Sequence, residues 1–212
     1  MSYENKIILV GGGGHCKVVL SILLENKKYE IVGIFDQQNK IGRKILGIDI
    51  KYTDDQLEKV HKKAMNAFVT LGSIGKSEKR IFLFNKLKNI GYTLPIIISK
   101  YAVISKETHI GEGTVVMPGA IVNPGAIIGK NCIINTGSII EHDCIIGDHV
   151  HIAPGVTLSG GVRIGNKSHI GTGSSIIQNI KIGKNVIVGA GSVVIKNILD
   201  NTKVYGVPAK IH

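Results

Sequence analysis

The sequence contains no tryptophan and only three cysteines, and aromatic residues make up 5% of its 212 residues. No apolar run approaches the ~20 residues that a membrane-spanning helix requires, and we expect no signal peptide ahead of Lys6. Cys16, Cys132 and Cys144 have neither the spacing of a metal site nor that of a disulfide framework, so we expect no metal. These absences argue against a membrane span and a secreted disulfide-rich domain, and they indicate a reduced, cytoplasmic protein.

Acidic residues are also scarce, because 15 Asp and Glu stand against 26 Lys and Arg and leave a formal net charge of +11. Such an excess is typical of proteins that bind nucleic acid. The lysines, however, stand mostly one at a time, and no aromatic residues alternate with them. Small anionic ligands such as nucleotide phosphates or coenzyme A explain the charge more simply.

The sequence is rich in one feature, a repeat with a period of six. A branched aliphatic residue stands at every sixth position from Ile104 to Val194, and the residue four positions later is usually small, as at Cys132 and Cys144. Neither a helix nor an alternating strand has this period, and a β-sandwich would not hold the phase. A period of six is typical of a hexapeptide β-helix. Three hexads make one coil, so the repeat predicts about five coils around a column of Ile and Val.

The first hundred residues alternate between short apolar strands and helical segments. We expect strands at 6–10, 30–35, 67–71 and 95–98 and helices at 17–26 and 76–89. The side chains expected inside the two helices are Val18, Val19, Ile22 and Leu23, and then Ile81, Phe82, Phe84 and Leu87. The alternation predicts a small Rossmann-like α/β domain with a parallel sheet at 1–100. A β-helix domain with a C-terminal tail then occupies 101–212.

A run of four glycines, Gly11 to Gly14, separates the first predicted strand from His15 and the first predicted helix. Bare N–H groups at the start of a helix form an anion site, although a tight turn without a ligand explains the glycines equally well. Cys16 replaces the third glycine of the dinucleotide fingerprint, so a mononucleotide-sized unit fits better. Ligand residues are expected to converge at the carboxyl ends of the strands. The residues at these ends are Gly13, Gly14, His15, Asp36 and Gly72.

His142, in the triplet Glu141-His142-Asp143, is the candidate general base. It follows the inward-facing Ile140 by two residues, which places it on the outer surface or at a corner of the coil. A neighbouring carboxylate can raise the basicity of an imidazole and fix its orientation. Histidine is the usual base for an attacking amine or hydroxyl. The alternative is a solvated histidine on the outer face, which we expect for His109 and His169; spacing alone leaves the choice for His142 open.

Several of these features together resemble one bacterial family over nearly the whole chain. They are the glycine-His turn, Asp36, the hexads, the Glu141-His142-Asp143 triplet and the C-terminal Tyr205-Gly-Val-Pro-Ala-Lys210. The family comprises sugar O- and N-acyltransferases, typified by the bacillosamine-pathway UDP-4-amino-sugar acetyltransferase, with sialic acid O-acetyltransferases as relatives. The resemblance implies a left-handed β-helix, a homotrimer with acetyl-CoA in the groove between neighbouring subunits, and a nucleotide sugar on the N-terminal domain.

The resemblance also implies roles for individual residues. His142 matches the catalytic base and Asp143 the adjacent carboxylate, a position where the family usually has glutamate. The positions that match coenzyme A contacts are His151, Thr172 and Ala190. The positions that match the nucleotide-sugar site are Gly13, Gly14, His15, Asp36 and Gly72, with Gln37 where a second acid often lies.

The activity implied by the resemblance is acetyl-CoA-dependent N-acetylation of a nucleotide-linked amino sugar, with UDP-4-amino sugars as the expected acceptors. The amine would attack the thioester directly, because the sequence contains no recognisable nucleophile triad. One alternative is O-acetylation of sialic acid or another polysaccharide sugar. A second is a scaffold that binds a nucleotide sugar without catalysis.

Overall fold

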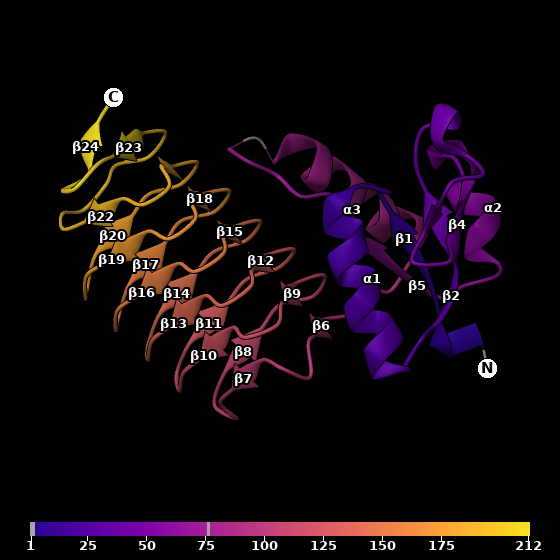
Figure 1. Cartoon of the computed structure of the whole chain (residues 1–212), viewed down its shortest axis with the longest axis horizontal. Coiled ribbons are helices and arrows are strands. Elements are labelled where there is room, and N and C mark those ends of the chain that lie inside the picture. Colours follow the sequence, from indigo (N-terminus) through magenta and orange to yellow (C-terminus); the bar gives the residue numbers. More distant parts are fainter. Residues whose placement is uncertain (1–2, 76) are drawn as a thin grey trace. The chain divides into compact units, whose positions relative to one another are not determined.

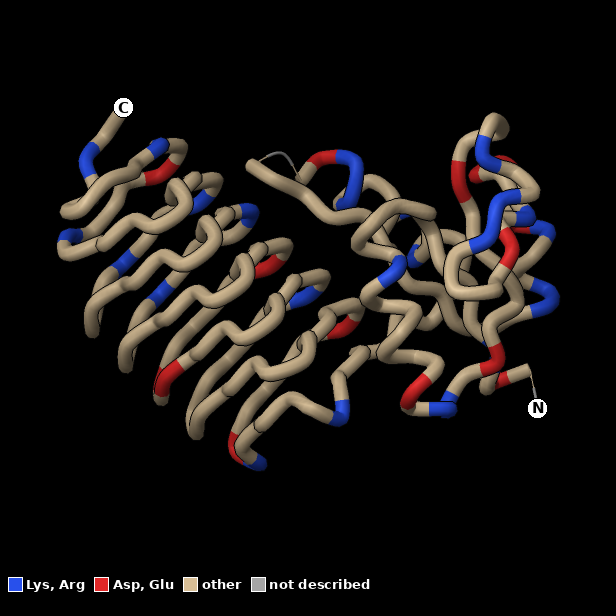
Figure 2. The backbone as a smooth tube through the Cα atoms, in the orientation of Figure 1, with Lys and Arg blue, Asp and Glu red and all other residues tan. Residues whose placement is uncertain are grey.

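The computed structural model describes residues 3–75 and 77–212, and the chain divides into two compact units, Met1–Ile97 and Ile98–His212 (Figure 1). Lys and Arg are dispersed along both units rather than gathered in one stripe (Figure 2), in keeping with their isolated positions in the sequence. None of the helices in the described ranges is long and apolar enough to cross a membrane.

The first unit is built on a five-stranded sheet with the strand order β3-β4-β2-β1-β5. Its strands are β1 (Lys6–Val10), β2 (Glu30–Phe35), β3 (Lys44–Ile45), β4 (Ile48–Tyr52) and β5 (Asn66–Val69). All neighbours run parallel except β3 and β4. Four residues of β1, Ile7 to Val10, are buried, because a parallel strand in the middle of a sheet is covered on both faces. This confirms the predicted α/β unit with a parallel sheet.

The helices of this unit are α1 (Gly14–Asn26), α2 (Leu57–His61) and α3 (Glu78–Ile90), and short 3-10 helices lie at Tyr3–Asn5, Gln38–Lys40 and Asp54–Gln56. Two side chains that we expected inside are exposed, Val18 at 37% and Phe82 at 64%. The buried residues of α3 are Arg80, Leu83, Phe84 and Leu87. They follow the i, i+3, i+4, i+7 spacing of one helix face, and Phe82 lies off that stripe.

Some boundaries also differ from the sequence prediction. Helix α1 begins at Gly14 rather than position 17, and β5 ends at Val69 rather than 71. Strands β3 and β4 and helix α2 were not predicted, because their segment is polar and interrupted by glycines. The start predicted at position 76 for α3 lies outside the described residues, and α3 is described from Glu78. The segment predicted at 95–98 is β6 (Ile97–Ile98), which belongs to the β-helix and not to the first sheet.

The second unit is a left-handed β-helix whose rungs form three parallel sheets. The first sheet contains β7 (Val103–Ile104), β10 (Ile121–Val122), β13 (Ile139–Ile140), β16 (Thr157–Leu158), β19 (Ser175–Ile176) and β22 (Val193–Val194). The second contains β8 (His109–Ile110), β11 (Ile127–Ile128), β14 (Ile145–Ile146), β17 (Arg163–Ile164) and β20 (Lys181–Ile182). The third contains β6, β9 (Val115–Val116), β12 (Ile133–Ile134), β15 (His151–Ile152), β18 (His169–Ile170), β21 (Ile187–Val188), β23 (Lys203–Tyr205) and β24 (Lys210–Ile211). The hexapeptide period is thereby confirmed.

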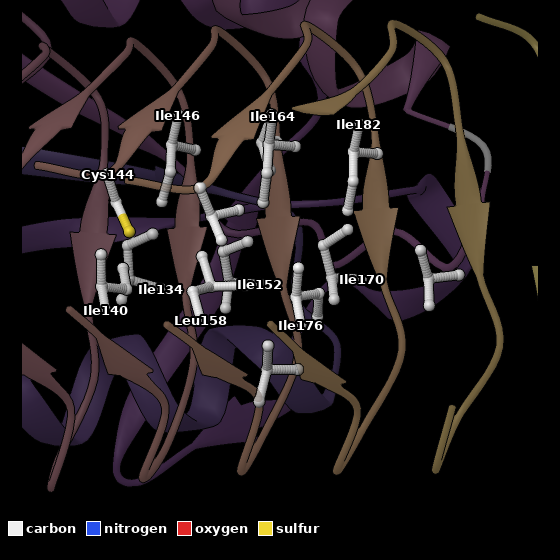
Figure 3. Close-up of a cluster of buried hydrophobic side chains, with 14 of the residues drawn as sticks. Ile134, Ile140, Cys144, Ile146, Ile152, Leu158, Ile164, Ile170, Ile176 and Ile182 are labelled. Atoms are coloured by element: carbon white, nitrogen blue, oxygen red, sulfur yellow. The ribbon is translucent and has the colours of Figure 1, made fainter. Parts of the chain in front are cut away.

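The second residue of each two-residue rung points into the coil, as Figure 3 shows for Ile146, Ile164 and Ile182. From Val116 to Val194 every member of the predicted column is buried, whereas Ile104 and Ile110 in the first coil are partly exposed. Burial of one such side chain contributes roughly 1.5–3 kcal/mol before the conformational entropy is subtracted. Stacked coils thus give this unit a continuous apolar core.

Candidate active site

His142 lies in the turn that follows β13, and the coils on either side hold its backbone. The amide of Gly161 donates to the carbonyl oxygen of His142 at 2.9 Å, and the amide of Asp143 donates to the carbonyl oxygen of Pro124 at 3.1 Å. The side chain of His142 is 65% exposed in the single chain. The turn therefore presents a solvent-accessible imidazole on a rigid backbone.

The imidazole of His142 contacts the carboxylate of Asp143, with 2.8 Å between Nδ1 and Oδ2. An ionised carboxylate can only accept a hydrogen bond, so Nδ1 carries the proton and Nε2 is left with a free lone pair. Asp143 has a φ of 59°, in the left-handed region that Asn and Asp occupy more readily than most residues. This geometry suits a general base that takes up a proton at Nε2.

Glu141, the other acid of the triplet, does not contact the imidazole through any printed interaction of its own. Its carboxylate accepts a hydrogen bond from Nδ2 of Asn123 at 3.0 Å, across to the preceding coil. We had expected both flanking acids to act on His142. In a turn, successive side chains diverge, and only Asp143 reaches the ring.

Cys144 follows Asp143 but is not available as a nucleophile. Its side chain is fully buried at the coil corner, and Sγ donates to the carbonyl oxygen of Ser159 at 3.3 Å. Burial raises the pKa of the Cys144 thiol to about 11, and burial also raises that of Cys16 to about 11. Thiols held in the neutral form are poor nucleophiles, which favours direct transfer over a covalent acyl-enzyme.

The residues expected to contact coenzyme A lie on another sheet of the coil from His142. Thr172 and Ala190 are exposed in the turns after β18 and β21, and the amide of Gly191 donates to the carbonyl oxygen of Thr172 at 2.8 Å. His151 lies in β15, and its Nε2 is 3.1 Å from Nδ2 of Asn135. The structure places all three along the third sheet, whereas His142 follows the first sheet.

His169 is not the solvated residue that we expected. It is 8% exposed and stands beside His151 on the neighbouring rung, with 4.9 Å between the ring centroids. The two histidines are 18 residues apart, which is one full coil, so the sequence does carry the signal. His109, by contrast, is exposed.

In the first unit, the glycine run and Asp36 come together at the carboxyl ends of the strands. The amide of Gly12 donates to Oδ2 of Asp36 at 2.7 Å, and the amide of Gln37 donates to Oδ1 at 2.7 Å. A cavity of about 440 Å³ borders Asp36 and Gln37, and its remaining lining residues are Gln38, Thr53, Asp54 and Asp55. These contacts tie the glycine loop to the end of β2.

Lys40 also binds the Asp36 carboxylate, with its Nζ 2.9 Å from Oδ2, and the sequence analysis missed it. The i, i+4 spacing of the pair was the available signal. Burial raises the pKa of Asp36, but hydrogen bonds from Gln37, Lys40 and Gly12 outweigh it, so the pKa lies below its ordinary value. Asp36 is therefore ionised at neutral pH and already holds three protein donors.

Gly13, Gly14 and His15 lie at the start of α1, where no side chain caps the helix. A β-carbon at Gly13 or Gly14 would meet nothing within 4 Å, so the backbone here borders open space. A side chain at Gly72 would contact His15. Burial, and then the nearby charge of Arg80, lower the pKa of His15 to about 4, so its ring is neutral at pH 7.

The described residues contain no group of three or more His, Cys, Asp and Glu that could hold a metal ion. The site chemistry on the page is therefore that of the His142 and Asp143 side chains and the glycine loop.

Comparisons with known proteins agree with this geometry. Residues 6–87 match the family described as PglD N-terminal domain, and residues 107–141, 125–160 and 161–196 match the bacterial transferase hexapeptide (six repeats). A search of curated proteins found no match.

Among solved structures, a histidine-to-asparagine variant of perosamine N-acetyltransferase from Caulobacter crescentus, in complex with CoA and GDP-perosamine, is 34% identical; the match has a TM-score of 0.92 and covers 98% of this chain and 96% of that chain. The acetyltransferase domain of PglB from Neisseria gonorrhoeae FA1090 is 33% identical, with a TM-score of 0.92 and coverage of 99% and 100%. That domain has also been solved in complex with acetyl coenzyme A. WeeI from Acinetobacter baumannii AYE is 29% identical, with a TM-score of 0.87 and coverage of 97% and 99%.

The fold and the repeats define an acyltransferase of the hexapeptide class. The identity of 34% over nearly the full length of both chains shows more: the protein belongs to the family of left-handed β-helix sugar acyltransferases. It is an acetyltransferase that uses acetyl-CoA as its co-substrate. The family and fold expected from the sequence are confirmed, and the alternative of a non-catalytic scaffold is set aside.

Proposed function

We propose that this acetyltransferase acetylates an amino group of a nucleotide-linked sugar, with His142 as the general base. The observation that carries the proposal is the 2.8 Å contact between Nδ1 of His142 and Oδ2 of Asp143, which leaves Nε2 free on an exposed turn. Support for the acceptor comes from the relative that was solved with CoA and GDP-perosamine. The product would be an acetamido sugar nucleotide for glycan or polysaccharide biosynthesis.

The reaction proceeds in one transfer. The sugar amine attacks the thioester carbonyl of acetyl-CoA, and Nε2 of His142 takes the amine proton as the new N–C bond forms. The tetrahedral intermediate then collapses, the C–S bond breaks, and the proton passes from His142 to the departing sulfur of coenzyme A. The Asp143 carboxylate stabilises the imidazolium in between, because it faces the protonated Nδ1. No enzyme atom is acylated, in keeping with the buried thiols.

The first unit holds the nucleotide portion in this proposal. Open backbone at Gly13 and Gly14 allows close approach of a pyrophosphate to the start of α1, where the helix dipole favours negative charge. Asp36 and Gln37 border the adjoining cavity and would meet the ribose or base, while His15 and Gly72 would close the other side of the loop. UDP-4-amino sugars are the acceptors that we favour, and GDP-linked ones are the closest competitors because of the perosamine enzyme.

The coenzyme would be held by the third sheet of a neighbouring copy. His142 and the expected coenzyme contacts His151, Thr172 and Ala190 lie on different sheets of one chain. A homotrimer would bring the His142 turn of one subunit opposite the third sheet of the next and complete the site. We place the reaction in the cytoplasm, where acetyl-CoA and nucleotide sugars are found.

The test measures free thiol release from acetyl-CoA with a panel of acceptors. The panel contains a UDP-4-amino sugar, GDP-perosamine, a free amino sugar and sialic acid. Turnover with a nucleotide-linked amino sugar supports the proposal, whereas turnover with sialic acid alone would make the enzyme an O-acetyltransferase.

The assignment of the base is tested with the best acceptor of that panel. His142→Ala should lower kcat by about 10²–10⁴-fold, the usual contribution of a general base, and leave acetyl-CoA affinity nearly intact. The matched control is His109→Ala, which removes another exposed histidine of the coil and should leave turnover unchanged. Near-wild-type turnover of His142→Ala would show that the base lies elsewhere.

A further inference from the structure

Gly160 lies 18 residues after His142, at the same turn position of the next coil. A β-carbon at position 160 would lie 2.5 Å from Nε2 and 2.6 Å from Cε1 of the His142 ring. Two non-bonded atoms do not approach so closely, because optimal carbon contacts lie near 3.5–4.0 Å. The imidazole thus occupies the space that any side chain at position 160 would need.

Other glycines of the turns are present for reasons of the backbone. Gly161 and Gly125 have φ values of +70° and +75°, a region that other residues rarely adopt. A β-carbon at Gly165 would lie 2.6 Å from the backbone carbon of Gly183. Gly160 has neither constraint: its φ lies outside the left-handed region, and its three nearest atoms all belong to the His142 ring. The backbone would accept alanine at position 160, and the imidazole would not.

We propose that Gly160 is a positioning residue for the general base, an inference that rests on the proposed role of His142. The ring lies between two fixed points, with Nδ1 at the Asp143 carboxylate and Nε2 against the α-carbon of Gly160. A methyl group at position 160 would push the ring away. Since the His142 side chain is exposed, rotation is the easiest relief, and rotation breaks the 2.8 Å contact with Asp143.

A second glycine, one coil on the other side, gives the same room to the carboxylate. A β-carbon at Gly125 would lie 2.5 Å from Oδ1 of Asp143. The His142 and Asp143 side chains therefore lie between Gly125 and Gly160 along one column of turns. Gly125 also needs its positive φ, so only Gly160 allows a substitution that affects the ring and leaves the backbone unstrained.

The experiment is Gly160→Ala in the full-length enzyme, assayed with the acceptor identified by the thiol-release panel. We expect kcat to fall by about 10²-fold or more, the cost of misplacing a catalytic group by about 1 Å. The KM for acetyl-CoA and the melting temperature should stay at wild-type values. The control is Gly119→Ala, whose β-carbon would meet only the α-carbon of Gly137 at 3.7 Å but whose φ is +72°. That variant should lose thermal stability and keep its kcat, the reverse pattern.

The decisive readout is the double variant His142→Ala/Gly160→Ala compared with His142→Ala alone. If Gly160 acts through the ring, the second substitution costs nothing further once the ring is gone. An equal fold-loss in both backgrounds would overturn the proposal and mean that the methyl group blocks substrate or distorts the coil. Wild-type kcat in Gly160→Ala, with His142→Ala inactive, would overturn it while leaving the base assignment intact. Full activity of His142→Ala would overturn both.

Discussion

Substitution of Ile146 by alanine tests the energetics of the coil. Ile146 is 1% exposed in β14, in register with Ile128 on one side and Ile164 on the other. Its neighbours cannot close in easily, because Gly129 and Gly147 form 2.8 Å backbone hydrogen bonds that fix the spacing of these rungs. An Ile-to-Ala change in a core costs about 2–5 kcal/mol, and a rigid site belongs in the upper part of this range.

Thermal unfolding followed by circular dichroism, at one protein concentration, measures this cost. At about 2–4 °C per kcal/mol, we expect a melting temperature roughly 6–20 °C lower than that of the wild type. The matched control is Ile110→Ala in β8, the end strand of the same sheet, where the side chain is partly exposed and one neighbouring rung is missing. Its cost should be clearly smaller. Equal shifts for the two variants, or none for Ile146→Ala, would refute the burial argument.

Two further predictions concern the first unit. The pKa of His15 lies at about 4 when folded and at 6.5 in its ordinary state, so the unfolded chain binds the extra proton between these pH values and stability falls as the pH drops from 6.5 to 4. Urea unfolding at pH 7.5 and pH 5 should show a smaller loss for His15→Gln than for the wild type, and identical losses would contradict the assigned pKa. Gly13→Val should keep the melting temperature, since the side chain enters open space, but weaken nucleotide-sugar binding in calorimetric titration while acetyl-CoA binding persists. Unchanged affinity would remove the glycine loop from the site.

The coil could be predicted from the sequence because one chemical requirement recurs at every rung. Each inward position needs a branched aliphatic side chain, and the period then gives the three faces without further information. Its beginning was misjudged for a physical reason. Ile98 is in phase with Ile104, but it is 37% exposed at the open end of the column, and in sequence the segment after Pro95 looks like one more strand of the first unit.

The first unit was less predictable at its edge. Strands β3 and β4 are short and largely polar, and their hairpin turn at Leu46 and Gly47 uses two left-handed residues. Central strands such as β1 are recognised by continuous burial, whereas an edge hairpin shows no such pattern. Helix α3 was placed correctly within a few residues, but its buried face was wrong because Phe82 is more apolar than Arg80, and packing follows the helical stripe instead.

Contacts around the candidate base were missed because they cross from one coil to the next. Asn123 and Glu141, Gly125 and Asp143, and His142 and Gly160 are all pairs separated by 18 residues. A comparison of positions six apart finds the column, since rungs repeat at that interval. Only a comparison at 18 finds side chains that lie on top of one another, and the coil length was already known from three hexads.

The same turn position explains why aspartate stands at 143 where the family usually has glutamate. In the turns that follow the first sheet, the residue at this position has a φ of +75° at Gly125, 59° at Asp143, +70° at Gly161 and 58° at Asn179. Gly, Asn and Asp tolerate this left-handed geometry best. Because Asp143 is adjacent to His142 and the turn brings the two side chains together, the short carboxylate still reaches Nδ1 at 2.8 Å. The demand of the coil for a left-handed residue and the demand of the base for an acidic neighbour are thus met by one side chain.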